Sequence, residues 1–143
     1  MATERNAHVT WRGSLMEGEG TIDSVGSGAF GPLDVTWASR AEDSDGRTSP
    51  EELIAAAHAA CFSMALSHGL AQAGSPAERL ETSATVTFVP GTGITAVALR
   101  VRGTVPGIDQ DAFLEGAEAA KAGCPVSKAL AGVPEITLDA ALA

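Results

Sequence analysis

Residues 49–74, which read SPEELIAAAHAACFSMALSHGLAQAG, decide the fold of this chain. Ser49 is a favoured helix N-cap, Pro50 suits the first helical position, and Glu52 follows the cap by three residues. Together they form a capping box with proline at the first helical position. Gly74 is a typical residue just past a helix C-terminus. The stretch therefore predicts one long helix that ends at about residue 73.

This predicted helix is apolar on nearly every face. Between Leu53 and Leu70 the clearly polar residues are His58, Ser63, Ser67 and His68. A helix that is apolar all round is normally buried all round. We therefore expect it to be the central element of the fold, with alanines that let neighbouring backbones approach closely.

Strand patterns precede the helix. Residues 8–13 and 20–25 are short mixed segments separated by a turn with two glycines, which predicts a pair of strands. Apolar residues alternate with polar or small ones from Leu33 to Trp37, which predicts a third strand that Arg40 closes. A polar loop follows over residues 41–49.

Strands and shorter helices follow the long helix. Two alternating segments, 80–88 and 97–105, flank the turn Pro90-Gly91-Thr92-Gly93 and predict a β-hairpin with one solvated face. Asp109 can cap a second helix that Gly123 ends. A short helix over 125–130 and a last strand over 136–140 complete the pattern.

The order of these elements indicates the fold class. Strands come in runs and do not alternate with helices, which is typical of an α+β fold with antiparallel sheets. No internal repeat, low-complexity tract or long linker interrupts the chain. We expect a single domain over residues 1–143.

Composition narrows the classes of partner. The 143 residues include 18 acidic and 9 basic ones, for a net charge of −9. Such a field repels phosphate, so we expect no nucleic acid and no anionic membrane as partner. An aromatic fraction of 4% without any Tyr also leaves no platform for base stacking. The hydrophobic fraction of 45% is high for a small monomer and favours a buried oligomeric interface.

The N-terminal residues MATERNAHVTW lack the apolar core of a signal peptide. No window approaches the roughly 18 apolar residues that a membrane span needs. We therefore expect a cytoplasmic protein, where thiols are reduced at rest.

Cys61 and Cys124 carry the functional interpretation. Cys61 lies inside the long helix, whereas Cys124 lies where one helix ends and Pro125 can open the next. A helix N-terminus lowers the pKa of a thiol, so Cys124 is a candidate reactive cysteine on local grounds. Cys61 needs a cationic or hydrogen-bonding neighbour to become reactive. Arg40 is the first candidate for that cation, and His58, one turn before Cys61, is its rival.

One arginine is enough to activate a thiol. Lowering a thiol pKa from about 8.5 to about 5.5 requires ~4 kcal/mol of differential stabilisation. A guanidinium at ~4 Å supplies about that much at an effective dielectric constant of ~20.

Other interpretations remain open at this point. A buried cysteine is often a small hydrophobe, and a histidine on an apolar helix is often a hydrogen-bonded core residue. A metal site formed by Cys61, His58 and Cys124 is not supported, because no CxxC or HxxxH spacing is present. No GxGxxG or P-loop pattern is present either. We expect neither a metal nor a cofactor.

Two separated blocks of sequence resemble a known family. The runs SPEELIAAAHAACFSMAL, VPGID and KAGCPVSKAL, preceded by VTWRG and EGEGTI, resemble the OsmC/Ohr family of osmotically inducible and organic hydroperoxide resistance proteins. The resemblance spans nearly the whole chain and includes both cysteines in their contexts. His58 resembles the OsmC branch, since the Ohr branch tends to carry Tyr there.

The resemblance implies a fold and an activity. Members of this family form intertwined homodimers whose antiparallel sheets wrap around central helices, and they reduce organic hydroperoxides, and hydrogen peroxide less well. By position, Cys61 looks like the peroxidatic cysteine and Cys124 like the resolving one. Arg40 and Glu51 match the family's arginine and glutamate. Ser49 stands where the family usually has Asn.

Helix geometry adds a constraint on Glu51. Glu51 and Cys61 are ten residues apart, which is ~15 Å along a straight helix. If Glu51 serves the Cys61 site, it must therefore come from the partner subunit, which would put the active site at the dimer interface.

We therefore interpret the chain as a thiol peroxidase for oxidative or osmotic stress defence. Arg40, held by Glu51, stabilises the Cys61 thiolate, which a hydroperoxide oxidises to a sulfenic acid and Cys124 converts to a disulfide. An external dithiol then reduces the disulfide, as lipoylated proteins do for relatives of the Ohr type. The alternatives are a redox sensor without turnover, or a dimeric binding protein with inert cysteines.

Overall fold

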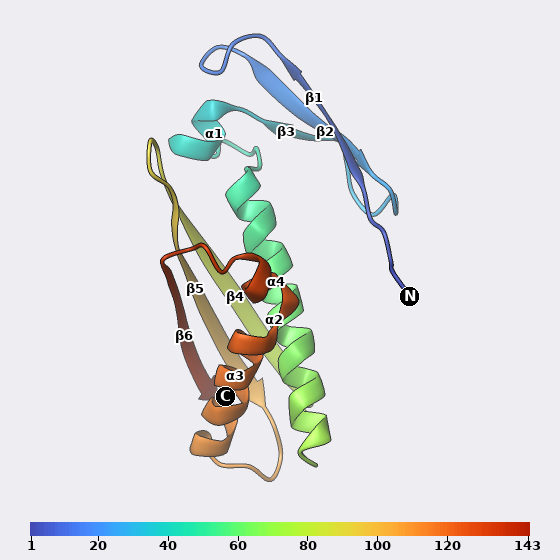
Figure 1. Ribbon diagram of the computed structural model, residues 1–143, viewed down its shortest axis with the longest axis vertical. Helices are drawn as coiled ribbons and strands as arrows, with labels where there is room; N and C mark the ends of the chain where they lie inside the picture. Colours follow the sequence, from blue (N-terminus) through green and yellow to red (C-terminus); the bar gives the residue numbers. More distant parts are fainter. The chain divides into compact units, whose positions relative to one another are not determined.

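The computed structural model describes all residues, Met1–Ala143 (Figure 1). They group into two compact units, Met1–Glu51 and Glu52–Ala143. Each unit has its own three-stranded sheet.

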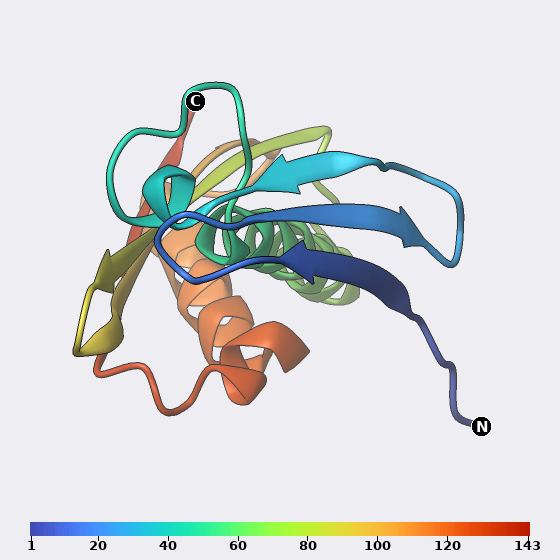
Figure 2. The same ribbon diagram turned by 90° about the horizontal axis from the view of Figure 1, so that it is seen from above.

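The first unit is an antiparallel meander. Strands β1 (Ala7–Arg12), β2 (Glu19–Val25) and β3 (Leu33–Val35) lie side by side in chain order, as Figure 2 shows. The pairing of the first two strands confirms the prediction from the sequence. Most of their side chains are at least partly exposed, and Ile22 is the only large apolar side chain of this unit that is buried.

The predicted strand through Trp37 is wrong at its end. Strand β3 stops at Val35, and Trp37–Ala41 form a short helix, α1. The reason is a reciprocal cap, in which the Ser39 amide donates to the Thr36 hydroxyl at 3.0 Å and the Thr36 amide donates to the Ser39 hydroxyl at 2.9 Å. Arg40 therefore lies in the last turn of a helix and does not close a strand.

Helix α2 (Pro50–Gln72) and the hairpin after it are as predicted. Strand β4 (Arg79–Val89) pairs antiparallel with β5 (Gly93–Thr104) across a tight turn. The amide of Thr92 donates to the Val89 carbonyl at 2.9 Å in that turn. The α+β class predicted from the sequence is thereby confirmed.

The second sheet departs from the predicted antiparallel arrangement at its last strand. Strand β6 (Glu135–Leu142) pairs parallel with β5, so the sheet order is β4-β5-β6 with mixed directions. Between β5 and β6 the chain passes through α3 (Gln110–Gly123) and α4 (Pro125–Ala129). A helical crossover of this kind carries the chain back to the end of the sheet where β5 began, which is what parallel pairing requires.

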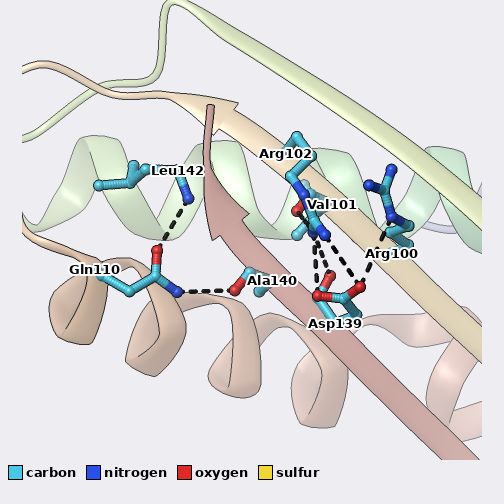
Figure 3. Close-up of polar contacts among 7 residues, drawn as sticks. All are labelled: Arg100, Val101, Arg102, Gln110, Asp139, Ala140 and Leu142. Carbon is cyan, nitrogen blue, oxygen red and sulfur yellow. Dashed lines mark hydrogen bonds and ion pairs between the residues drawn. The ribbon is translucent and has the colours of Figure 1, made fainter.

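Polar contacts hold β6 in place (Figure 3). The Arg102 guanidinium donates from Nη1 and Nη2 to the two carboxylate oxygens of Asp139, both at 3.1 Å. The Gln110 side chain donates to the Ala140 carbonyl at 2.9 Å and accepts from the Leu142 amide at 3.0 Å. These contacts tie the end of β6 to β5 on one side and to α3 on the other.

The core of the second unit lies between α2, the sheet and α3. Phe62, Leu66 and Leu70 on α2 meet buried residues of β5 and α3 in one cluster. Gly103 lets Phe113 approach the sheet closely, since a Cβ at position 103 would come within 2.6 Å of the Phe113 ring. This packing fixes the face of α2 that carries the candidate functional residues.

Helix α2 is not buried all round, contrary to the expectation from its composition. One stripe, formed by His58, Phe62, Leu66 and Leu70, is buried. On the opposite face Ala57 and Ala60 are exposed, and Met64 is 72% exposed. A single chain provides too few packing partners for a helix that is apolar on every face, so a large apolar face stays uncovered.

Helix α2 also differs from the expectation about membrane spans. By length and composition alone it is apolar enough to cross a membrane. Core helices of soluble proteins have the same property, so this finding is weak evidence for a membrane protein.

Candidate functional site

The two cysteines, 63 residues apart in sequence, lie side by side in the second unit. Cys61 is in the middle of α2, and Cys124 is the residue between α3 and α4. Both are free thiols, and their side chains interact through a hydrogen bond. The fold therefore places the two thiols next to each other.

Cys124 is fully buried and polarised by its surroundings. As predicted, it is the N-cap of α4, with Pro125 at the first helical position. Its sulfur completes no capping hydrogen bond, but the amides of Val126 and Ser127 attract negative charge there. Burial raises the pKa of Cys124, but the hydrogen bond with Cys61, these amides and the Ser127 hydroxyl outweigh burial, so the pKa is lowered overall.

Cys61 is partly exposed, and its environment acts in the opposite direction. Burial raises the pKa of Cys61, the hydrogen bond with Cys124 raises it further, and the Val126 amide lowers it only in part. None of the groups that shift this pKa is a cation. Of the two cysteines, Cys124 is thus the one that loses its proton first as the pH rises. Cys61 needs a positive charge beside it to become a nucleophile.

His58 does not supply that charge. It is fully buried, and burial lowers its pKa, so the imidazole is neutral at pH 7. Its Nε2 lies 2.7 Å from the Ser127 hydroxyl oxygen. Burial therefore disfavours the rival interpretation of His58 as the activating cation.

Ser127 is a residue that sequence reasoning missed. It is buried, and its hydroxyl hydrogen-bonds to the Cys124 thiol as well as to His58. Its position three residues after the N-cap, within the run CPVS, is the local signal that could have found it, because that position is the usual partner of an N-cap side chain.

Arg40 and Glu51 form an ion pair within the first unit. Arg40 donates from Nε and Nη2 to the two carboxylate oxygens of Glu51, at 2.9 Å each. The Glu51 side chain is buried, whereas about a third of the Arg40 side chain is exposed (32%). This two-point contact fixes the plane of the guanidinium.

A small apolar cavity of about 180 Å³ adjoins this guanidinium. Its walls are Trp11, Leu15, Val35, Thr36, Trp37, Arg40 and Pro50. Both tryptophans of the chain are among them. The first unit thus combines an apolar cavity with one cation at its edge.

No group of three or more His, Cys, Asp or Glu side chains is arranged to hold a metal ion. The site residues predicted from the sequence form two pairs, Cys61 with Cys124 and Arg40 with Glu51. Each pair lies within one compact unit.

Known proteins resemble this chain over nearly its whole length. A family model described as OsmC-like protein matches residues 42–139. A protein of Escherichia coli K12 named peroxiredoxin OsmC is 43% identical over 142 residues, covering 97% of this chain and 96% of that protein. The relative of the same name in Shigella flexneri shows the same identity and coverage.

Solved structures show the same fold. The organic hydroperoxide resistance protein OhrB of Bacillus subtilis matches with a TM-score of 0.65 and 27% identity, over 96% of this chain and 98% of that one. An OsmC-like protein from Mycoplasma pneumoniae matches with a TM-score of 0.72 over 99% of both chains, at 16% identity. At that identity the likeness concerns the fold alone.

Proposed function

Because the chain belongs to the family of OsmC-like proteins, we propose that it is a cysteine-based peroxidase that reduces organic hydroperoxides, and hydrogen peroxide less well. The observation that carries this proposal is the contact between Cys61 and Cys124. Relatives named as a peroxiredoxin and as an organic hydroperoxide resistance protein support the substrate class.

The different exposure of the two thiols supports a division of roles. Cys61 is partly exposed and can meet a peroxide, whereas Cys124 is fully buried and cannot. Cys61 is therefore the peroxidatic cysteine in our proposal. The pKa of Cys124 is lowered, which suits the resolving cysteine, because its thiolate can attack the oxidised Cys61 sulfur beside it.

The reaction has two steps in this chain. The Cys61 thiolate attacks the terminal oxygen of the hydroperoxide, the O–O bond breaks, and the alkoxide takes up a proton and departs as an alcohol. Cys61 is left as a sulfenic acid. Cys124 then attacks the Cys61 sulfur, so that a disulfide forms and the sulfenic oxygen is lost as water. An external dithiol restores the two thiols.

Arg40 is the cation that we assign to Cys61, with Glu51 holding it in place. The Arg40 side chain is partly exposed and its charge is held in place by Glu51, which suits contact with a thiolate and a peroxide oxygen. The apolar cavity beside Arg40 has the chemical character to accept the hydrocarbon part of an organic hydroperoxide.

The geometry of α2 favours a site shared between two copies of the chain. Along this helix Glu51 and Cys61 are separated by ~15 Å, and Arg40 is bonded to Glu51 of its own chain. We infer that Arg40 and Glu51 serve Cys61 of the partner subunit. The exposed apolar face at Ala57, Ala60 and Met64 supplies a surface that a homodimer would cover.

We further propose a soluble, cytoplasmic protein, since a reducing compartment keeps both thiols free for the next cycle. The reductant is a dithiol, and a lipoylated protein has the required chemistry. Defence against oxidative or osmotic stress is the role that fits this activity.

Rapid mixing of the reduced protein with cumene hydroperoxide or hydrogen peroxide, followed by counting of free thiols, tests the proposal. We expect fast loss of two thiols per chain, with preference for the organic peroxide. The Cys61→Ser variant should consume no peroxide and should keep its Cys124 thiol. In the Cys124→Ser variant the reaction should stop at the sulfenic acid on Cys61. Loss of thiols without turnover in the presence of a dithiol would favour a redox sensor.

Arg40→Ala tests the assigned cation. Removing a guanidinium that stabilises the thiolate should slow peroxide reduction at pH 6 by about 100-fold or more. Arg47→Ala is the matched control, because Arg47 is an exposed arginine paired with Asp45 in the same unit. Equal rates for Arg40→Ala and the unaltered protein would exclude Arg40.

A further inference from the structure

The contact between His58 and Ser127 has no part in the chemistry described above. Both residues are buried, and they come from positions 69 residues apart, on α2 and α4. The Nε2···Oγ distance is 2.7 Å. The other ring nitrogen, Nδ1, is buried and has no hydrogen-bond partner. A buried polar contact that leaves one nitrogen unpaired costs stability, which calls for a functional reason.

The unpaired Nδ1 indicates where the ring proton lies. Burying an N–H group without an acceptor is rarer in folded proteins than burying an unpaired acceptor. The neutral imidazole therefore carries its proton on Nε2, and Nε2–H donates to the Ser127 oxygen. Because a hydroxyl has only one proton, that of Ser127 is then directed away from His58 and toward the Cys124 sulfur, with which Ser127 hydrogen-bonds.

We propose that His58 is a positioning residue, which orients the Ser127 hydroxyl so that it donates to the Cys124 sulfur and holds Cys124 as the thiolate that closes the disulfide. The inference rests on the proposed function, since it assigns how the second step of that reaction is prepared. Ser127 contacts the reacting sulfur, and His58 acts only through Ser127.

Formation of the disulfide from the sulfenic acid conserves atoms and charge. The Cys124 thiolate forms a bond to the Cys61 sulfur, and the S–O bond of the sulfenic acid breaks. The departing hydroxide takes up one proton, equal to the one that Cys124 released when it became a thiolate, and leaves as water. The Cys124 sulfur is oxidised and the Cys61 sulfur is reduced by the same amount, while the oxygen keeps its oxidation state.

Few other titratable groups surround Cys124. The titratable groups on α2 that face Cys124 are Cys61, which hydrogen-bonds to Cys124, and His58, which contacts Ser127. On the neighbouring helices, Lys121 reaches Glu118 and the Ile136 carbonyl, and Lys128 is exposed. The thiol titration therefore depends on Cys61, His58 and Ser127.

The first test needs no peroxide. In a Cys61→Ser background, thiolate formation at Cys124 is followed by the ultraviolet absorbance of the thiolate, which no tyrosinate obscures because the chain has no Tyr. Ser127→Ala and His58→Phe should both shift the titration to higher pH. His58→Gln should restore it, since a Gln side chain also offers an N–H donor. Ser63→Ala is the matched control, because Ser63 has a 2.7 Å side-chain hydrogen bond to Thr82.

The second test measures closure of the disulfide after a single addition of cumene hydroperoxide, by intact mass. The sulfenic acid should persist about 10- to 100-fold longer in Ser127→Ala and His58→Phe, the range expected for a lost hydrogen bond to a charged group. His58→Gln should close within a few-fold of the unaltered protein.

Specific results would overturn the inference. An unshifted titration in Ser127→Ala, which removes one oxygen atom and should fold, would do so. So would a His58→Gln variant that is folded by circular dichroism but as impaired as His58→Phe. If the unaltered protein instead loses no thiol to hydroperoxide, the proposed function fails, and the titration still decides the role of His58.

Discussion

At the scale of single residues, the two cysteines are distinguished by what touches them. Cys124 is buried among groups that favour its thiolate, whereas burial and its neighbour disfavour the thiolate at Cys61. The thiol that ionises more readily is therefore not the thiol that a peroxide can reach. In the proposed site, a cation beside Cys61 removes this mismatch.

His58 should make the protein sensitive to acid. Burial lowers its pKa below the ordinary value of 6.5, so between these two values the unfolded chain binds a proton that the folded chain does not. Stability should therefore be complete above pH 6.5 and fall as the pH drops below it. Urea unfolding at pH 7.5 and pH 5 measures the loss.

The variant His58→Gln, which cannot titrate, should lose less stability over the same range. His68→Gln is the control, since His68 is exposed on the same helix. An equal loss in the unaltered protein and in His58→Gln would assign the acid sensitivity to other groups.

The sequence located the cysteines but not the contacts around them. Cys61 and Cys124 stood out because their residue types carry the chemistry, and Cys124 also had Pro125 after it. The partner of His58 could not be predicted, because Ser127 is 69 residues away on α4 and meets His58 on α2 only in the folded chain. Such pairs depend on tertiary structure, which no local pattern encodes.

At the scale of elements, local signals predicted α2 and the β4–β5 hairpin well. Capping residues, a stop glycine and period-2 alternation act within a few residues, so they can be recognised in sequence. Helix α1 was missed because its cap uses Ser39 in place of the usual Glu or Gln. The parallel direction of β6 was missed because it depends on the route of the chain through α3 and α4.

The two faces of α2 should respond differently to truncation. Phe62 is fully buried in the core, so Phe62→Ala should lower the free energy of unfolding by about 3–5 kcal/mol. Met64, which is 72% exposed in the single chain, is the matched position on the opposite face.

Met64→Ala should cost less than about 0.5 kcal/mol at protein concentrations where the chain is monomeric. At higher concentration it should weaken association, which sedimentation velocity measures. A large loss of monomer stability in Met64→Ala would contradict the one-sided burial of α2.

At the scale of the whole molecule, the redox state should control stability. A disulfide between Cys61 and Cys124 closes a loop of about 64 residues, which by the chain-entropy relation stabilises the folded state by ~4 kcal/mol. Oxidation with diamide should therefore raise the urea midpoint of the protein. Cys124→Ser should show no such rise, and an oxidised protein less stable than the reduced one would indicate strain in closing the bond.

The unequal burial of the two sulfurs also determines how the oxidised protein is reset. In the cycle proposed above, an incoming dithiol meets the partly exposed Cys61 sulfur and not the buried Cys124 sulfur, so the mixed disulfide forms at Cys61 and Cys124 is the leaving group. A thiol with a lowered pKa departs faster in such an exchange. The groups around Cys124 that prepare its attack in one half of the cycle therefore assist its departure in the other, and every round of regeneration begins at the same atom that met the peroxide.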